Sequence, residues 1–217
     1  MKAPTFHDVQ QNSEEWFALR LGKATSSIAA DFMAFDGKPF GDGAKNAALR
    51  IALERITKRR AEGGFSNHHT SRGHAQEPIA KMLYEAENFA TISNGGFFDC
   101  GEYGGSPDGL VGDDGLIEVK SVIGAVHYET LLRGAPDPAY RWQLVSHLDT
   151  TGRQWVDFCS YCEEFPRELQ LITYRVSAES AGVQEDLRRL RNRRLSFLKT
   201  LVEPNETKIM EAIQNFI

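Results

Sequence analysis

Apolar residues recur along the chain at two different spacings, and these spacings predict an alternation of helices and strands. Helical spacing, with capping or breaking residues at the ends, is typical of 13–20, 25–32, 42–60, 71–87 or 76–87, 127–133, 139–148, 178–201 and a short helix from Pro204 onward. Strand-like runs occupy 90–99, 103–111, 115–121, 154–161 and 169–176. This order predicts an α/β fold with a mixed central sheet flanked by helices.

The same pattern predicts which residues are buried and which begin the helices. Ser13, Thr25 and Asp42 are expected to cap the first three helices. Residues expected in the core are Trp16, Leu49, Leu53, Ile56, Ile79, Met82, Leu83, Ala86, Trp142 and Trp155. The long helix 178–201 presents an apolar seam, interrupted by Arg194, made of Val183, Leu187, Leu190, Phe197 and Leu201. The segment 61–69 is rich in Gly, Ser and His and is predicted to be a loop.

Length and composition favour one enzyme-sized domain. The 217 residues are 41% hydrophobic, enough to bury a sizeable core. We expect a single domain over 1–217, with a core over about 12–176 and C-terminal helices over about 178–217. The N-terminus lacks the apolar segment of a secretion signal, and no apolar run approaches the ~18 residues of a membrane span. A soluble, cytoplasmic protein is therefore expected.

The cysteines and the charges exclude some classes of protein. Three cysteines, Cys100, Cys159 and Cys162, argue against a disulfide scaffold, and the strand-like surroundings of Cys159 favour a structural role. The net charge of −5 excludes a uniformly basic surface but not a local one. Two basic clusters on predicted helices are read equally well as DNA-facing or as solvated helix faces: Arg55, Lys58, Arg59, Arg60, and Arg188, Arg189, Arg191, Arg193, Arg194.

The segment with the clearest chemistry is a predicted hairpin over 108–121. Its turn is Asp114-Gly115, and Asp108 lies near the far end of the strand that pairs with Glu118. Alternation places Glu118 and Lys120 on one face and turns the intervening residues toward a core. Two carboxylates side by side suit Mg²⁺ or Mn²⁺, and a lysine beside them can hold or deprotonate an attacking water. The alternative is a surface hairpin with an acidic turn and a salt bridge.

Several motifs in register resemble the phage lambda exonuclease family, the viral-recombinase branch of the PD-(D/E)xK nucleases. The motifs are Trp16-Phe17-Ala18-Leu19-Arg20-Leu21-Gly22, Thr25 with Ser27, Gly73 with Glu77, Ser106-Pro107-Asp108-Gly109-Leu110, Glu118-Val119-Lys120 and Tyr140-x-x-Gln143. The resemblance covers roughly residues 12–160. It implies a restriction-endonuclease-like core, and a homotrimer around DNA encoded by a phage or prophage. It also implies Mg²⁺-dependent 5′→3′ digestion of one strand of linear duplex DNA to 5′ mononucleotides. The remaining 3′ strand would pass to a single-strand annealing protein.

The resemblance also assigns catalytic roles. Asp108 and Glu118 would bind the metal with the backbone carbonyl of Val119, and Glu77 could complete a two-ion site. Lys120 would orient or activate the attacking water. Gln143 would hold Lys120 or that water. Taken alone, Glu77 is equally a first-turn carboxylate favoured by the helix dipole, and Lys120 an edge-strand lysine.

A second set of residues matches the family's pocket for a 5′-terminal phosphate. Its members are Arg20, Thr25, Ser27 and Ser106. A guanidinium grips phosphate through two N–H donors, and hydroxyls at a helix start add to an anion site. For Thr25 and Ser27, simple helix capping is the alternative. Relatives often carry Tyr where this chain has His147, so His147 has no assigned role and is expected to be a partly buried structural histidine.

Two other functions remain open. The same site could act as an endonuclease of restriction or junction-resolving type. The chain could also be a non-catalytic module that binds DNA ends. An iron–sulfur nuclease would need four thiolates, which three cysteines do not supply. His68, His69 and His74 receive no ligand role.

Overall fold

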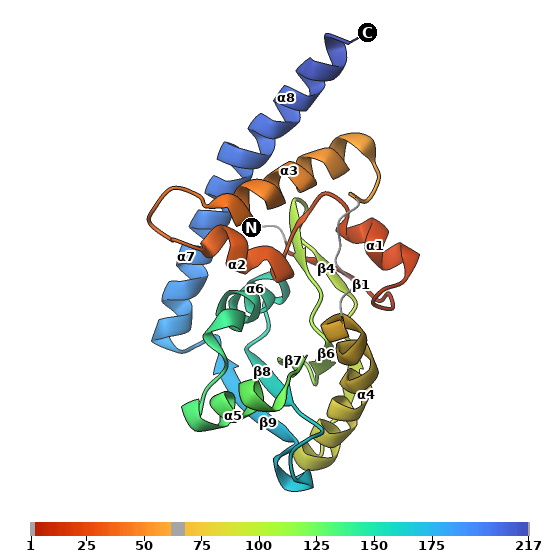
Figure 1. The fold of residues 1–217 in the computed structure, drawn as a ribbon, viewed down its shortest axis with the longest axis vertical. Helices are drawn as coiled ribbons and strands as arrows, with labels where there is room; N and C mark the ends of the chain where they lie inside the picture. The colour runs from red at the N-terminus through yellow and green to blue at the C-terminus, as the bar shows by residue number, and fades with distance from the viewer. Residues whose placement is uncertain (1–2, 62–67, 217) are drawn as a thin grey trace.

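Two sheets and their covering helices make up the fold in the computed structural model, which describes residues 3–61 and 68–216, without the side chains of 68–71 and 74 (Figure 1). The strands are β1 (Thr5–His7), β2 (Ala24–Thr25), β3 (Ile92–Asn94), β4 (Phe97–Asp99), β5 (Tyr103–Gly105), β6 (Gly109–Val111), β7 (Gly115–Ser121), β8 (Trp155–Tyr161) and β9 (Leu171–Ser177). The α-helices are α1 (Glu14–Arg20), α2 (Ala29–Met33), α3 (Asp42–Thr57), α4 (His68–Asn88), α5 (Gly124–Arg133), α6 (Arg141–Thr151), α7 (Ala181–Phe197) and α8 (Glu203–Gln214).

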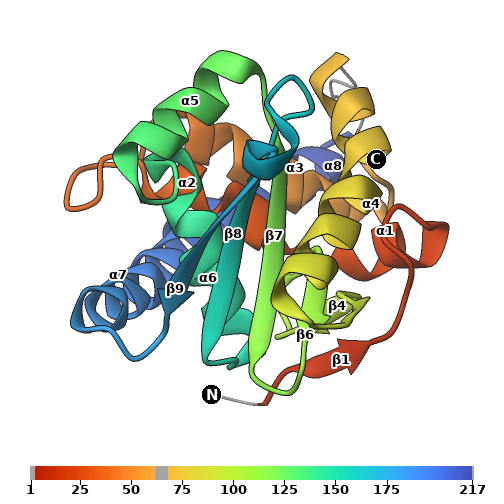
Figure 2. The ribbon, with the colours of Figure 1, turned by 90° about the horizontal axis from the view of Figure 1, so that it is seen from below.

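The larger sheet carries the predicted hairpin at its centre. Its strand order is β3-β6-β7-β8-β9; β7 and β8 run parallel and the other neighbours antiparallel. Helix α4 covers one face, where Ala80 and Tyr84 pack against Ile117 and Val119. Helices α6 and α7 lie on the other side of the sheet (Figure 2). The predicted α/β fold with a mixed sheet flanked by helices is confirmed.

Two predicted strands are each divided between the two sheets. The run 90–99 becomes β3 and β4, and the run 103–111 becomes β5 and β6, because β4 and β5 belong to a smaller sheet of order β1-β4-β5-β2. The break at Gly95 is required by a backbone crossing, since a Cβ there would lie 1.8 Å from the carbonyl oxygen of Pro107. The short strands β1 and β2 carry too little pattern to be predicted.

The helix boundaries agree with the sequence in part. The Ser13 side chain accepts a hydrogen bond from the Trp16 N–H, as expected for a cap. Thr25 makes no such bond, and the predicted helix begins as a 3₁₀ turn at Ser26–Ile28 before α2. Asp42 is the first residue of α3 rather than its cap, which is Gly41. Residues 62–67 of the predicted loop lie outside the described residues, and α4 starts at His68.

The buried faces of two helices are rotated relative to the prediction. On α4, Ile79 and Met82 are exposed, and the helix buries Gln76, Ala80 and Tyr84. On α3, Leu49 is exposed and small residues, among them Ala44, Ala48 and Ala52, face the core. Small side chains allow α3 to pack closely, whereas the apolar spacing alone marks the larger residues. The α7 seam is correct for Leu187, Leu190 and Phe197, which are buried.

The C-terminal helices contribute to the same core. Leu187, Leu190 and Phe197 of α7 join a cluster that contains Leu116, Leu144 and Phe158 of the larger sheet and α6. A π-helical segment, Leu198–Val202, leads into α8, which extends away from the body of the molecule (Figure 1). Within residues 3–61 and 68–216, no helix combines the length and apolar character needed to cross a bilayer.

Candidate active site

Asp108 lies at the open end of the β6–β7 hairpin, opposite the turn. Register places Gly109 against Ile117, so Asp108 comes beside the central part of β7. The backbone N–H of Val119 donates a 2.7 Å hydrogen bond to Asp108 Oδ2. Gly109 allows β3 to pack against this point, since a Cβ there would lie 2.3 Å from Ile92 Cγ2. The hairpin therefore holds one oxygen of Asp108 and leaves the other outside this bond.

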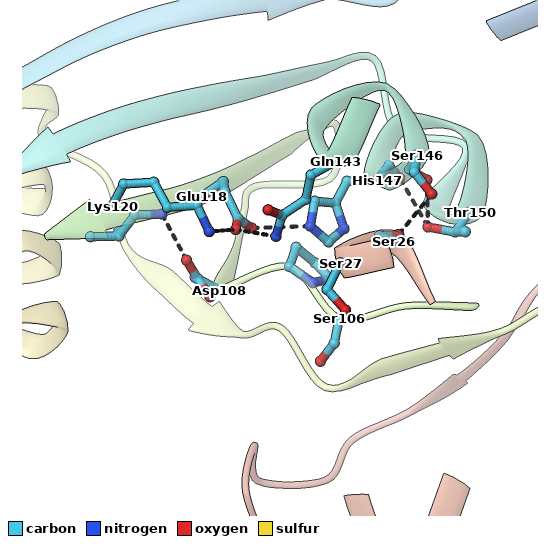
Figure 3. Close-up of polar contacts among 12 residues, drawn as sticks. Ser26, Ser27, Ser106, Asp108, Glu118, Lys120, Gln143, Ser146, His147 and Thr150 are labelled. Atoms are coloured by element: carbon cyan, nitrogen blue, oxygen red, sulfur yellow. Dashed lines mark hydrogen bonds and ion pairs between the residues drawn. The ribbon is translucent and has the colours of Figure 1, made fainter. Parts of the chain in front are cut away.

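Glu118 lies next to Asp108 on β7, and this strand is covered by α6 on one face of the sheet and by α4 on the other. Its side chain is buried, because α6 covers the face that carries Glu118 and Lys120. Lys120 Nζ and Gln143 Nε2 donate hydrogen bonds of 2.6 and 2.5 Å to Glu118 Oε1 (Figure 3). Gln143 thus contacts Glu118, not Lys120. The structure brings Asp108, Glu118, Lys120 and Gln143 together, which is inconsistent with a surface salt bridge on a hairpin.

His147 is a member of this cluster that the sequence did not assign. It is fully buried rather than partly buried, and its Nε2 lies 3.0 Å from Glu118 Oε2. The contact has the distance of an ion pair without the alignment of a hydrogen bond, so Glu118 Oε2 has no hydrogen-bond partner in the described part of the chain. The position four residues after Gln143 on α6, one helical turn away, was the available signal.

The two carboxyl groups have opposite pKa shifts. Burial, the negative charge of Glu118 and that of Glu77 raise the pKa of Asp108 well above its ordinary value. Burial would also raise the pKa of Glu118, but the charges of Lys120 and His147 lower it to about 2. Burial opposes the ammonium of Lys120, yet Glu118 and Asp108 raise the pKa of Lys120 above its ordinary value. Lys120 is therefore a protonated donor and not a base in this arrangement.

Helix α4 contributes Glu77 and a lysine that sequence reasoning missed. Lys81 Nζ lies 2.6 Å from Glu77 Oε1 and donates a 2.5 Å hydrogen bond to the backbone carbonyl of Asp108. Lys81 therefore ties α4 to the strand end that carries Asp108. Its place one turn after Glu77 was the only sequence signal, and many helix pairs share that spacing.

The donor set of this site fits a divalent cation. Asp108 is half-buried and Glu118 is buried, their negative charges repel each other, and among the described residues Glu118 Oε2 has only the poorly aligned contact with His147. A cation would relieve both conditions, and carboxylate oxygens are the ligands that Mg²⁺ and Mn²⁺ prefer. Within the described residues, no three His, Cys, Asp or Glu side chains already converge on one point. Glu77 is ion-paired with Lys81 instead.

Three of the four predicted phosphate-pocket residues meet beside α1. Arg20 Nη2 lies 3.4 Å from Ser27 Oγ, which lies 3.0 Å from Thr25 Oγ1. The Arg20 guanidinium stacks over Trp16, 4.0 Å from the ring centroid. Burial and the positive charges of Arg50 and Arg60 lower the pKa of Arg20 to about 10. Cations that repel one another around two hydroxyls form a site suited to an anion.

Ser106 is used differently from its three predicted partners. Its hydroxyl accepts a 2.7 Å hydrogen bond from Trp16 Nε1 and donates to the carbonyl of Gly96. This places Ser106 at the edge of the Trp16 ring, whose face carries the Arg20 guanidinium. The hydroxyl proton is already engaged, so Ser106 orders the pocket in this conformation.

Helix α6 connects the carboxylates to the phosphate pocket. Ser146, the neighbour of His147, donates a 2.9 Å hydrogen bond to Ser26, the neighbour of Ser27 (Figure 3). The contact requires a glycine at position 105, because a Cβ there would lie 2.2 Å from Thr150 Oγ1. The two groups of residues are therefore held on one rigid frame.

The arginines of α7, the cysteines and the tryptophans make contacts within the fold. Arg188, Arg189, Arg191, Arg193 and Arg194 all contact acidic side chains, or a backbone carbonyl in the case of Arg193. Cys159 and Cys162 are buried free thiols, and burial raises the pKa of Cys159 to about 12. Trp16 is buried as predicted, whereas Trp142 and Trp155 are half-buried. The side chains of His68, His69 and His74 lie outside the described residues.

Comparison with known proteins agrees with this geometry. Residues 15–154 match the sequence model of the family described as YqaJ-like viral recombinase domain. An alkaline exonuclease (LHK-Exo) from Laribacter hongkongensis is similar at 33% identity, over 93% of this chain and 99% of that chain, with a TM-score of 0.79. The same exonuclease in complex with dAMP gives a TM-score of 0.81, with the same identity and coverage.

A more distant structure agrees in fold only. The phage-related exonuclease from Haemophilus somnus 129PT is 13% identical over 84% of this chain and 96% of that chain, with a TM-score of 0.59. The search of curated proteins returned no match. The matched region contains every candidate site residue, and the chain belongs to the family of YqaJ-like viral recombinase domains.

Proposed function

We propose that this protein is a Mg²⁺-dependent 5′→3′ exonuclease on linear double-stranded DNA. The observation that carries the proposal is the pair of neighbouring carboxylates, half-buried Asp108 and buried Glu118, held on the same frame as the Arg20 pocket. The 33% identity to an alkaline exonuclease over nearly all of both chains supports the same class of reaction. A single nuclease domain over 1–217, a homotrimer around DNA and delivery of the 3′ strand to an annealing protein belong to the proposal through the family resemblance.

The chain's own residues would divide the work as follows. Asp108, Glu118 and the Val119 carbonyl would hold Mg²⁺ or Mn²⁺, and Glu77 would join a second ion after leaving Lys81. The ions would neutralise the scissile phosphate and activate water. Lys120 would donate to the scissile phosphate or to the attacking water as a protonated ammonium. Gln143 and His147 would keep Glu118 oriented.

The Arg20 pocket would set the polarity and the length of the product. A 5′-terminal phosphate bound by Arg20, Thr25 and Ser27 would fix how far the chain end lies from the carboxylates. Ser106 would hold Trp16 beneath Arg20. Each cleavage exposes a new 5′ phosphate that can enter the pocket, so mononucleotides would be released in sequence.

The test uses one linear duplex with or without a 5′ phosphate, and a closed circle of the same sequence. With Mg²⁺ we expect 5′ mononucleotides from the phosphorylated duplex and a rate about tenfold lower without the phosphate, the loss of one charge-assisted contact. Chelator should stop the reaction. Equal rates on the duplexes with and without a 5′ phosphate would contradict a phosphate pocket at Arg20. Cleavage of the closed circle would favour an endonuclease.

A further inference from the structure

A groove beside the catalytic carboxylates holds apolar side chains that the fold leaves exposed. It lies between α4 and β3, has a volume of about 310 Å³, and is lined by the apolar residues Pro78, Met82 and Ile92 together with the polar residues Lys81, Glu85, Ser93 and Asn94. Asp108 also lines it, so the groove opens directly onto the candidate active site. The Met82 side chain is 59% exposed, although Ala80 and Tyr84 of the same helix are buried. Packing of the core does not explain why this position is apolar.

The position of the groove relates it to the path of the substrate strand. Ser27 and Ser106 lie on one side of Asp108 in Figure 3, and α4 lies at the opposite edge of that view, beyond Asp108 and Lys120. A strand whose 5′ phosphate lies in the Arg20 pocket and whose first linkage lies at Asp108 must continue away from that pocket. The groove starts at Asp108 and therefore lies where the continuing strand would pass.

The chemistry of the groove suits a nucleotide. Its volume is near the lower end of ordinary ligand sites, the size of a small ligand. Lys81 uses two of its three N–H donors, on Glu77 and the Asp108 carbonyl, and retains one for a phosphate oxygen. The flexible thioether of Met82 packs against differently shaped surfaces, which fits a subsite that must accept every base.

We infer that this groove binds the nucleotide on the 3′ side of the scissile phosphate. Its base and sugar pack against Pro78, Met82 and Ile92, and the phosphate that follows it on the 3′ side faces Lys81. The inference rests on the proposed function, because the direction of the strand comes from the 5′-phosphate pocket. It adds a substrate subsite on α4 to the residues that hold the metal and the chain end.

A matched pair of exposed residues on α4 tests the inference kinetically. Met82→Asp places a carboxylate in the groove, whereas Ile79→Asp places one on the same helix at a position that does not line it. We expect Met82→Asp to raise KM for linear duplex about tenfold, with kcat and the preference for a 5′ phosphate retained, and Ile79→Asp to change KM by less than about twofold. Equal effects of the two substitutions would overturn the subsite.

A cross-linking experiment maps the nucleotide itself. A duplex whose second nucleotide from the 5′ end carries a tether ending in a mixed disulfide is incubated in chelator with Met82→Cys, Ile79→Cys or the unsubstituted protein, so that attack by a cysteine thiolate releases the small thiol and forms the cross-link. A disulfide with Met82→Cys alone supports the subsite; cross-linking with Ile79→Cys to the same extent, or none with Met82→Cys, contradicts it. Failure of the unsubstituted protein to digest linear duplex would instead contradict the proposed function, so the two failures are distinguishable.

Discussion

Two pairs of carboxylates face very different surroundings in this molecule. Asp149 and Asp186 lie against the arginines of α6 and α7: Asp149 contacts Arg191 and Arg194, and Asp186 contacts Arg141 and Arg189. Asp108 and Glu118 are close enough for the charge of Glu118 to raise the pKa of Asp108; Lys120 and His147 contact Glu118, and no ion pair of Asp108 is present in the described part of the chain. Each carboxylate of the first pair contacts two arginines, whereas in the second pair Asp108 is left to take up a proton or a bound cation.

The comparison shows why a count of charges is a weak guide to function. The five arginines over 188–194 are the densest positive segment of the sequence, yet each one contacts this same chain. The anion pocket around Arg20 contains fewer cations, but they repel one another. In both cases, charges of the same sign that lie close together mark the place for a ligand more clearly than the number of charged residues does.

The largest expected effect comes from removing one charge from the pair formed by Asp108 and Glu118. Asp108→Asn retains the size of the side chain and removes a metal ligand, and should lower kcat on linear duplex by about a thousandfold. Asp186→Asn, a matched change in the other pair, should leave kcat per folded molecule unchanged. A fall in kcat of similar size in both variants would remove the distinction between the pairs.

Removing an arginine from the pair formed by Asp149 and Asp186 should lower stability, whereas the change at Asp108 should lower activity. Arg194→Met leaves the buried Asp149 with Arg191 as its remaining arginine and should destabilise the protein by about 3 kcal/mol in urea unfolding. Arg188→Ala, at an exposed ion pair, should leave the unfolding midpoint unchanged within error. An Arg194→Met protein as stable as the parent would show that the α7 cluster does not depend on its ion pairs.

A smaller effect is expected in the pH dependence of stability without metal. The pKa of Asp108 is raised in the folded state, so its contribution is most favourable at acidic pH and is lost as pH rises through that raised pKa. In chelator near neutral pH, Asp108→Asn should therefore melt at a higher temperature than the parent, and the difference should shrink as pH falls. Glu118 acts oppositely, since its stabilisation is lost only as pH falls toward about 2.

A difference that grows on acidification would contradict the raised pKa of Asp108. The measurement is a series of thermal unfolding curves for both proteins in chelator. Glu118→Gln serves as the control, since it should lower the melting temperature at neutral pH.

The sequence predicts the hairpin better than its surroundings. The alternation along the second strand is a local signal, and it places Asp108 and Glu118 side by side. The predicted turn at Asp114-Gly115 is displaced, because the turn occupies residues 112–114 and Gly115 is the first residue of β7. The contacts of His147 with Glu118 and of Lys81 with Asp108 join distant elements, and no local pattern encodes them. The viral-recombinase resemblance and the α/β fold are confirmed; the roles of the individual site residues stay predictions.

The errors on α3 and α4 have a common physical origin. Both helices carry apolar residues on more than one face, and the sequence does not state which face meets the sheet. On α4, Ala80 and Tyr84 pack against β7, so Ile79 and Met82 are left in solvent, and Met82 lines the groove that also contains Asp108. In the sequence, an apolar residue that contacts a substrate has the same helical spacing as one that packs in the core. Only the packing of the helix distinguishes the two.

The most direct test of the central claim is calorimetric titration of the metal-free protein with Mn²⁺. If Asp108 and Glu118 jointly hold the cation, the unsubstituted protein binds Mn²⁺ with release of protons at mildly acidic pH. Asp108→Asn and Glu118→Gln should each weaken that binding at least about tenfold. Equal affinity in all three proteins would contradict a metal site at the open end of this hairpin.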